Sequence, residues 1–301
     1  MAVLTVNNLT KDYGQNRGVF DVSFAVEKGE VFGFLGPNGA GKTTTIRHLL
    51  GFSRPQEGST GILGMDSWKD AKQIQRHLGY LPGEIAFPND MKGMQFIKYI
   101  AEMRGMKDIK KATELIDMFQ FDPTGELKRM SKGMKQKIGI VCAFMSDPEI
   151  LILDEPTSGL DPLMQSTFVQ LIANEKAAGQ SILMSSHMFE EVEETSDRIG
   201  MIKGGRLVAV IKPKDIRHAE NKTFKIEFLN DSDFASMRSL GFNITGIKPG
   251  QKQIIVDIED ADINGLLAAL ATRKVKFISE TKHTLEEFFM QYYEGDSSNV
   301  Q

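Results

Sequence analysis

A glycine-rich segment after a short apolar run restricts the fold of this chain more than any other feature. Residues 36–44 read GPNGAGKTT and directly follow the apolar run Val31–Leu35. The order Gly, four residues, Gly, Lys, Thr is the spacing of a phosphate-binding loop between a strand and a helix. Glycines let several backbone N–H groups converge on one anion, and the start of a helix favours negative charge. The segment therefore predicts an α/β fold with a site for the phosphates of a nucleotide.

Two side chains of this loop carry chemistry of their own. Lys42 supplies an ammonium for the terminal phosphates, and Thr43 supplies a hydroxyl that can ligate Mg²⁺. The alternative is a glycine-rich turn with an incidental lysine, which the preceding strand and following helix disfavour. The other loop positions that we expect to contact the nucleotide are Gly36, Asn38, Gly39, Ala40, Gly41 and Thr44.

A second apolar run ends in two carboxylates. Residues 150–153 read ILIL, typical of a buried parallel strand, and Asp154 and Glu155 follow. Beside a phosphate loop, Asp154 is suited to hold Mg²⁺ through its water shell. Glu155 is suited to orient and deprotonate the water that attacks the γ-phosphate. The alternative is a pair of surface carboxylates at the end of a strand.

These segments, with two more, resemble the ATP-binding cassette (ABC) ATPases. Residues 130–137 (MSKGMKQK) stand where that family has its signature, residues 150–162 read ILILDEPTSGLDP, and residues 185–187 read SSH. Order and spacing match the family over about residues 1–218. The resemblance implies a phosphate-loop nucleotide-binding domain, with a RecA-like core, an antiparallel β subdomain and a helical subdomain.

The resemblance also implies ATP and Mg²⁺ as ligands and a head-to-tail pair of such domains. Ser131 and the Gly133 backbone would then contact the partner's nucleotide, and Asp161 would reach the partner's loop. Tyr13 would stack on adenine, and His187 would contact the γ-phosphate. Taken without the family, Ser131 and Asp161 are helix N-caps. Without the family, Tyr13 would equally be interpreted as a packing residue, and His187 as a structural hydrogen-bonding group.

The sequence departs from the family at two places. Gly83 stands where the family usually has a glutamine, and Glu84 follows it. We assign Glu84 a role at the Mg²⁺ side of the site as a hypothesis, because of this position. In the signature, Lys132 replaces a glycine and Met134 replaces a glutamine, which is consistent with a subfamily variant because Glu155 and His187 are retained.

The pattern changes after the basic stretch that ends at His218. We expect an α/β domain over residues 1–218, a small α+β domain over 219–295 and a disordered tail over 296–301. The expected strands of the second domain are 222–228, 253–258 and 275–279, and the expected helices are 233–240, 262–272 and one that begins at Thr284.

Composition narrows the class of function. The chain has 36 basic and 40 acidic residues and a formal net charge of −4, which disfavours a nucleic-acid partner. No run of about 18 apolar residues is present, so a cargo would cross the membrane through separate permease subunits. The single cysteine, Cys142, lies in an apolar stretch and is expected to be a buried thiol.

The form of the chain resembles the ATPases of bacterial exporters with small permeases, which move drugs, peptide antibiotics or ions outward. We therefore expect an ATP-hydrolysing subunit at the cytoplasmic face of the membrane. It would pair with a second ATPase subunit, identical or related, and would dock on permeases through residues 79–105. The alternative is a soluble ABC ATPase that acts on the ribosome or DNA. The absence of a second cassette and the negative charge disfavour it.

Overall fold

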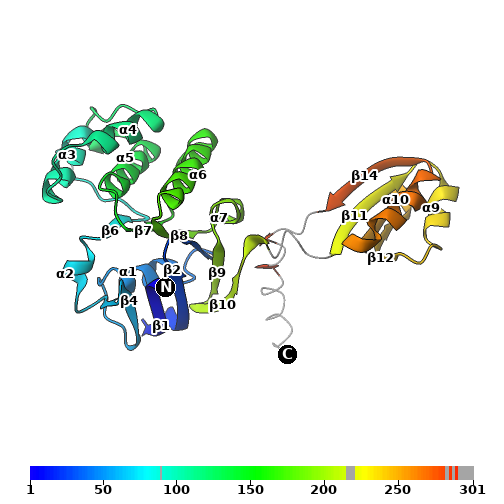
Figure 1. Ribbon diagram of the computed structural model, residues 1–301, viewed down its shortest axis with the longest axis horizontal. Coiled ribbons are helices and arrows are strands. Elements are labelled where there is room, and N and C mark those ends of the chain that lie inside the picture. Colours follow the sequence, from blue (N-terminus) through cyan, green and yellow to red (C-terminus); the bar gives the residue numbers. More distant parts are fainter. Residues whose placement is uncertain (89, 215–220, 282–284, 287–288, 291–301) are drawn as a thin grey trace. The chain divides into compact units, whose positions relative to one another are not determined.

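The computed structural model describes residues 1–88, 90–214, 221–281, 285–286 and 289–290 (Figure 1). Contacts divide the chain into two compact units, Met1–Lys212 and Pro213–Gln301. The boundary predicted at residue 218 lies outside the described residues. So do the predicted helix start at Thr284 and the predicted tail 296–301.

A six-stranded sheet forms the centre of the first unit, with the strand order β10-β9-β3-β8-β7-β6. Its pairs are parallel except for β9 with β10. The two predicted strands are present as β3 and β7, and all their residues are buried, as in parallel strands covered on both faces. The strands are β3 (Val31–Leu35), β6 (Leu78–Leu81), β7 (Ile150–Asp154), β8 (Ser181–Ser186), β9 (Arg198–Lys203) and β10 (Arg206–Ile211).

The register of this sheet brings three chain segments to one edge. Leu35 at the end of β3 pairs with Ser186 at the end of β8, and Asp154 at the end of β7 pairs with Ser185. The carboxyl ends of parallel strands meet at the same edge, where ligands of open α/β sheets bind. The phosphate loop, the two carboxylates and His187 therefore leave the sheet side by side.

A second, antiparallel sheet of the first unit has the order β2-β1-β4-β5. Phe24 on β2 stacks on Phe32 of β3, with ring centroids 5.0 Å apart, so the two sheets share an apolar core. The strands are β1 (Ala2–Asp12), β2 (Gly18–Glu27), β4 (Glu57–Ile62) and β5 (Met65–Asp66).

A group of helices lies apart from the antiparallel sheet (Figure 1). Its core includes Phe119, Phe144 and Phe168, which are fully buried. The predicted helix after Asp161 is present as α6, and Asp161 caps it by accepting a hydrogen bond from Met164 N–H at 3.0 Å. The helices of the unit are α1 (Lys42–Leu49), α2 (Ala71–Ile74), α3 (Gly93–Met103), α4 (Lys110–Met118), η1 (Leu127–Arg129), α5 (Lys132–Phe144), α6 (Pro162–Ala177) and α7 (Phe189–Thr195).

Over the described residues 221–281, the second unit is an antiparallel sheet with two α-helices, in the chain order strand, helix, strand, strand, helix, strand. The strand order β12-β13-β11-β14 is that of a ferredoxin-like fold. Three strands and two helices fall where the sequence predicts them, and β12 is an addition. The elements are β11 (Asn221–Phe228), α9 (Asp231–Met237), β12 (Asn243–Lys248), η2 (Pro249–Gln251), β13 (Gln253–Glu259), η3 (Asp260–Asp262), α10 (Ile263–Ala271) and β14 (Val275–Thr281).

Candidate functional site

The phosphate loop joins β3 to α1, and its glycines are required by local geometry. Gly41 has φ +112°, and a Cβ there would lie 2.7 Å from Val19 Cγ1. A Cβ at Gly36 would lie 2.4 Å from the carbonyl oxygen of Ile202. The loop borders a cavity of about 170 Å³. Its lining residues are Pro37, Asn38, Gly39, Gly41, Lys42, Thr43, Thr44 and Glu155.

Two of the predicted loop contacts, Gly36 and Ala40, are not among the residues that line this cavity. Ala40 is buried, and its N–H donates to the carbonyl oxygen of Pro37 at 3.2 Å. Gly36 N–H donates to the carbonyl oxygen of Ser186 at 3.3 Å. Ala40 N–H therefore closes the loop on itself, and Gly36 N–H ties the start of the loop to the end of β8.

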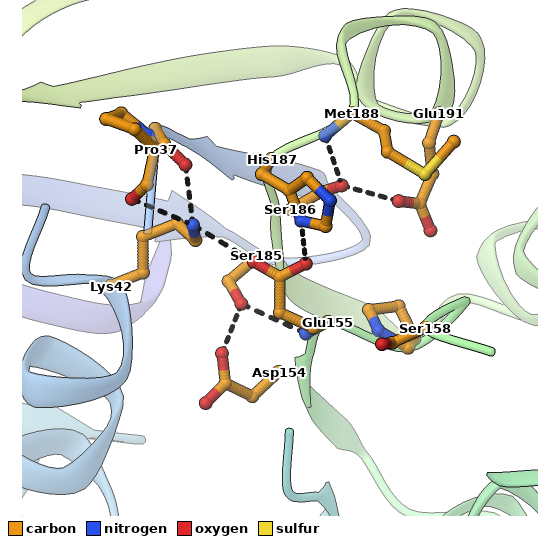
Figure 2. Close-up of polar contacts among 12 residues, drawn as sticks. Pro37, Lys42, Asp154, Glu155, Ser158, Ser185, Ser186, His187, Met188 and Glu191 are labelled. Carbon is orange, nitrogen blue, oxygen red and sulfur yellow. Dashed lines mark hydrogen bonds and ion pairs between the residues drawn. The ribbon is translucent and has the colours of Figure 1, made fainter. Parts of the chain in front are cut away.

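Lys42 reaches Glu155 and the carbonyl groups of the loop (Figure 2). Its side chain is 5% exposed, and Nζ lies 3.0 Å from Glu155 Oε1. Nζ also donates to the carbonyl oxygens of Gly36 at 2.5 Å and Pro37 at 3.3 Å. The ammonium is thus fixed beside the cavity by one carboxylate and two carbonyl groups.

Asp154 connects β7 to the loop and to β8. It is 1% exposed, its Oδ2 accepts from Thr43 Oγ1 at 2.8 Å, and its Oδ1 accepts from Ser185 Oγ. A hydroxyl and a carboxylate that meet at the end of the loop are hard oxygen ligands, as Mg²⁺ prefers. Burial, with the nearby charge of Asp154, raises the pKa of Tyr80 to about 12.

Glu155 stands between two basic side chains at the edge of the sheet. It is a non-glycine residue with φ +51°, a sparsely populated conformation. His187 Nδ1 lies 2.5 Å from Glu155 Oε2, on the opposite oxygen from Lys42 (Figure 2). The carboxylate is 19% exposed and His187 is 48% exposed, so this pair faces the outside of the chain.

The signature residues begin α5. Ser131 accepts a hydrogen bond from Met134 N–H at 3.2 Å, so its N-cap role is confirmed. A Cβ at Gly133 would lie 2.6 Å from the carbonyl oxygen of Gly159, so only glycine fits there. Lys132 Nζ donates to Ser158 Oγ at 2.7 Å. The cavity lining given above contains neither Ser131, Gly133 nor Asp161.

Tyr13 and Glu84 are exposed side chains. Tyr13 is 53% exposed, and Lys11 Nζ lies 5.8 Å from its ring centroid, so the described Tyr13 is not a core packing residue. Gly83, the residue before Glu84, faces Asp154, because a Cβ at Gly83 would lie 3.4 Å from Asp154 Oδ2. The role at the Mg²⁺ side assigned to Glu84 stays a prediction.

Two polar residues take part in the site although the sequence did not single them out as functional. Ser185 Oγ donates to Asp154 and accepts from Glu155 N–H at 3.2 Å. Gln136 is 2% exposed and donates to the carbonyl oxygen of Pro156 at 2.8 Å, which ties α5 to the segment after Glu155. The available signal for Ser185 was the polar end of an apolar strand, whereas Gln136 stands between two lysines in the sequence and has no such signal.

Known proteins match both the sequence and the fold. The profile of the family described as ABC transporter matches residues 19–158. The bacitracin transport ATP-binding protein BcrA of Bacillus licheniformis is 30% identical, over 97% of this chain and 98% of that protein.

Solved structures agree. The structure of an ATP-binding subunit of an ABC transporter has a TM-score of 0.66 and 31% identity, over 71% of this chain and 92% of that one. The dimeric structure of MJ0796, a bacterial ABC transporter cassette, has a TM-score of 0.64 and 20% identity, over 70% of this chain and 98% of that one, and shows the shared fold. This chain therefore belongs to the ATP-binding proteins of ABC transporters and is an ATPase of that family.

Proposed function

We propose that this chain powers the export of a drug, peptide or ion through separate permease subunits. The observation that carries the ATP-driven part of the proposal is that Glu155, which lines the cavity of the phosphate loop, pairs with both Lys42 and His187. The relationship to BcrA supports an exporter, because it extends over 97% of the chain and so includes most of the second unit.

The chemistry proposed for the site follows from its contacts. The triphosphate of ATP lies over the loop, where Lys42 pairs with its terminal oxygens. Because Lys42 also pairs with Glu155, a phosphate that engages Lys42 leaves the carboxylate free to take a proton from water. His187, on the other carboxylate oxygen, holds the attacking water and the γ-phosphate in line.

Thr43 and Asp154 would hold Mg²⁺ in this proposal. Their oxygens lie 2.8 Å apart, and Asp154 is buried, so the pair suits a small hard cation. When bound, the ion neutralises charge on the β- and γ-phosphates. Ser185 holds the second oxygen of Asp154 and thereby fixes the direction of the carboxylate.

A second copy or a related chain completes the site. Ser131, Gly133 and Asp161 lie outside the cavity lining, which supports contact with a nucleotide held by the partner. The dimeric structure of the MJ0796 cassette supports the same pairing. The start of α5 would then direct its positive end at the partner's γ-phosphate, and Tyr13 would stack on adenine.

Permease subunits are the proposed membrane partners, which places the chain at the cytoplasmic face of the membrane. Among the described residues, no helix has the length and apolar character needed to span a bilayer. Residues 79–105 are the proposed docking region. Within them Tyr99 and Met103 of α3 are 46% and 68% exposed and offer apolar surface to a partner.

Affinity purification from detergent-solubilised membranes of the natural host tests this function. We expect small membrane subunits to elute with the tagged chain and to stimulate its ATPase activity. Recovery of the chain with ribosomes or DNA, and without membrane subunits, would show that it is not a transporter component.

A further inference from the structure

Two neighbouring serines at the end of β8 have different partners. Ser185 donates to Asp154, as described above. Ser186 Oγ donates instead to Glu191 Oε2, at 2.5 Å, in the first turn of α7. Successive side chains of a strand point to opposite faces, so one serine serves the carboxylate at the site and the other faces α7.

Glu191 belongs to a small hydrogen-bond network that includes the residues before and after His187 (Figure 2). A serine hydroxyl has one hydrogen, and Ser186 gives it to Glu191; a lone pair of the same oxygen accepts from Met188 N–H at 3.0 Å. The residues on both sides of His187 are therefore held through one hydroxyl. Within α7, Thr195 Oγ1 donates to the backbone carbonyl oxygen of Glu191 at 2.7 Å.

Burial of an ionised carboxylate such as Glu191 is destabilising unless hydrogen bonds replace those that it made to water. Its side chain is 7% exposed. Burial raises the pKa of Glu191 to about 7, against the hydrogen bond from Ser186, which lowers it. The hydrogen bond from Ser186 to Oε2 therefore ties the buried carboxyl group to the end of β8, directly before His187.

We propose that Glu191 is a positioning residue for ATP hydrolysis, which fixes the turn that holds His187 against Glu155 through the Ser186 hydroxyl. The inference rests on the proposed roles of Glu155 and His187. Glu191 is not among the residues that line the cavity of the phosphate loop. Its loss therefore lowers turnover and leaves nucleotide binding in place, because Ser186 loses its acceptor and the turn at His187 loosens.

Two substitutions at this position separate positioning from packing. Glu191→Leu retains a side chain of similar volume in α7 and removes the oxygen that accepts from Ser186. Glu191→Gln keeps an amide oxygen that can accept from Ser186. Turnover, KM for ATP and the affinity for a fluorescent ATP analogue are measured for both, and NMR of labelled histidine reports the environment of the His187 ring.

We expect Glu191→Leu to lower turnover about tenfold with the affinity unchanged within about twofold, and to shift the His187 signal. Glu191→Gln restores turnover to within about threefold of the parent chain. Unchanged turnover in Glu191→Leu, or an equal loss in both variants, would overturn the proposal. An unmoved His187 signal would do the same.

A second pair of variants covers the case in which Glu191→Leu does not fold. Ser186→Ala removes the donor from the other side, and we expect a similar loss of turnover. Adding Glu191→Ala, which removes the acceptor, to Ser186→Ala then costs little further, whereas additive losses of the two single changes contradict a shared role. Glu155→Gln, measured in parallel, tests the proposed function itself: if it retains full turnover, the assigned base is wrong, whatever Glu191 does.

Discussion

The phosphate loop and the signature segment differ in how completely their own chain holds them. Lys42 is 5% exposed and is bound by Glu155 and two loop carbonyls. At the start of α5, Ser131 and Lys132 are exposed. Within the described part of the chain, Ser131 accepts from Met134 N–H and Lys132 donates to Ser158 of the neighbouring loop.

This difference is informative about assembly. A loop whose ammonium and carboxylates are already placed can bind a nucleotide within one chain. At the start of α5, Gly133 packs closely against Gly159, and the residues before it are exposed. An exposed helix N-terminus of this kind is suited to contact an anion held by a partner. One half of the proposed site is therefore built within the chain, and the other half faces outward.

The largest expected effect is on turnover when the loop half loses its base. Glu155→Gln should lower ATP turnover about 100-fold or more and leave nucleotide affinity near that of the parent chain. Phosphate release and nucleotide titration check this. Glu149→Gln is the matched control: Glu149 lies just before β7, is 47% exposed and pairs with His77, so turnover should not change. Equal losses in the two variants would contradict the assignment.

Removal of the loop cation has the next largest effect. Lys42→Ala should weaken nucleotide affinity about 10- to 100-fold, because charge-assisted hydrogen bonds to phosphate are lost. Lys132→Ala is the matching change in the signature segment and should leave the affinity of the single chain unchanged. Titration of a fluorescent nucleotide into each variant decides between them, and equal weakening would remove the distinction between the two halves.

A smaller effect concerns stability against pH. The pKa of Glu191 is raised by burial from 4.5 to about 7, so between these values the folded chain retains a proton that the unfolded chain has released. This contribution to stability is complete below about pH 4.5 and is lost as pH rises through 7, by at most about 3 kcal/mol.

Glu191→Gln removes the titrating group. The free energy of unfolding of the variant, relative to the parent chain, should therefore increase between about pH 5 and pH 8. Urea unfolding followed at several pH values measures it. Parallel pH profiles for the two chains would show that the carboxyl group does not titrate in this range.

The smallest expected effect is at Gly83. A side chain there would start 3.4 Å from the Asp154 carboxylate, so Gly83→Gln places an amide beside the proposed Mg²⁺ ligand. We expect nucleotide affinity in the presence of Mg²⁺ to change by no more than about threefold, since Asp154 and Thr43 already supply oxygen ligands. A loss larger than tenfold in the same titration would show that position 83 must stay open.

The sequence predicts best what depends on neighbours along the chain. The loop at 36–44, the strand before Asp154 and the helix after Asp161 are present as predicted, because glycine spacing, apolar runs and caps act locally. The role of Ser185 depends on the register of β7 with β8, about 30 residues apart in the chain, which no local pattern shows.

The elements that were missed have weak local patterns. β1 pairs with β2 through several register shifts, which interrupt the alternation expected of a half-buried strand. β12 lies at the edge of its sheet, contains Gly246 and is largely exposed. The resemblance aligns position 83 with the family's glutamine, and the structure agrees, because a Cβ at 83 would face Asp154.

The mass of the Glu155→Gln chain in solution with Mg²⁺ and ATP tests the central proposal most directly. If ATP joins two copies through the loop of one and the signature of the other, the particle has twice the 33.5 kDa of one chain. Adding Ser131→Arg to the same background should return it to the mass of one chain. A single-chain mass at saturating ATP, or a dimer indifferent to Ser131→Arg, would contradict the account.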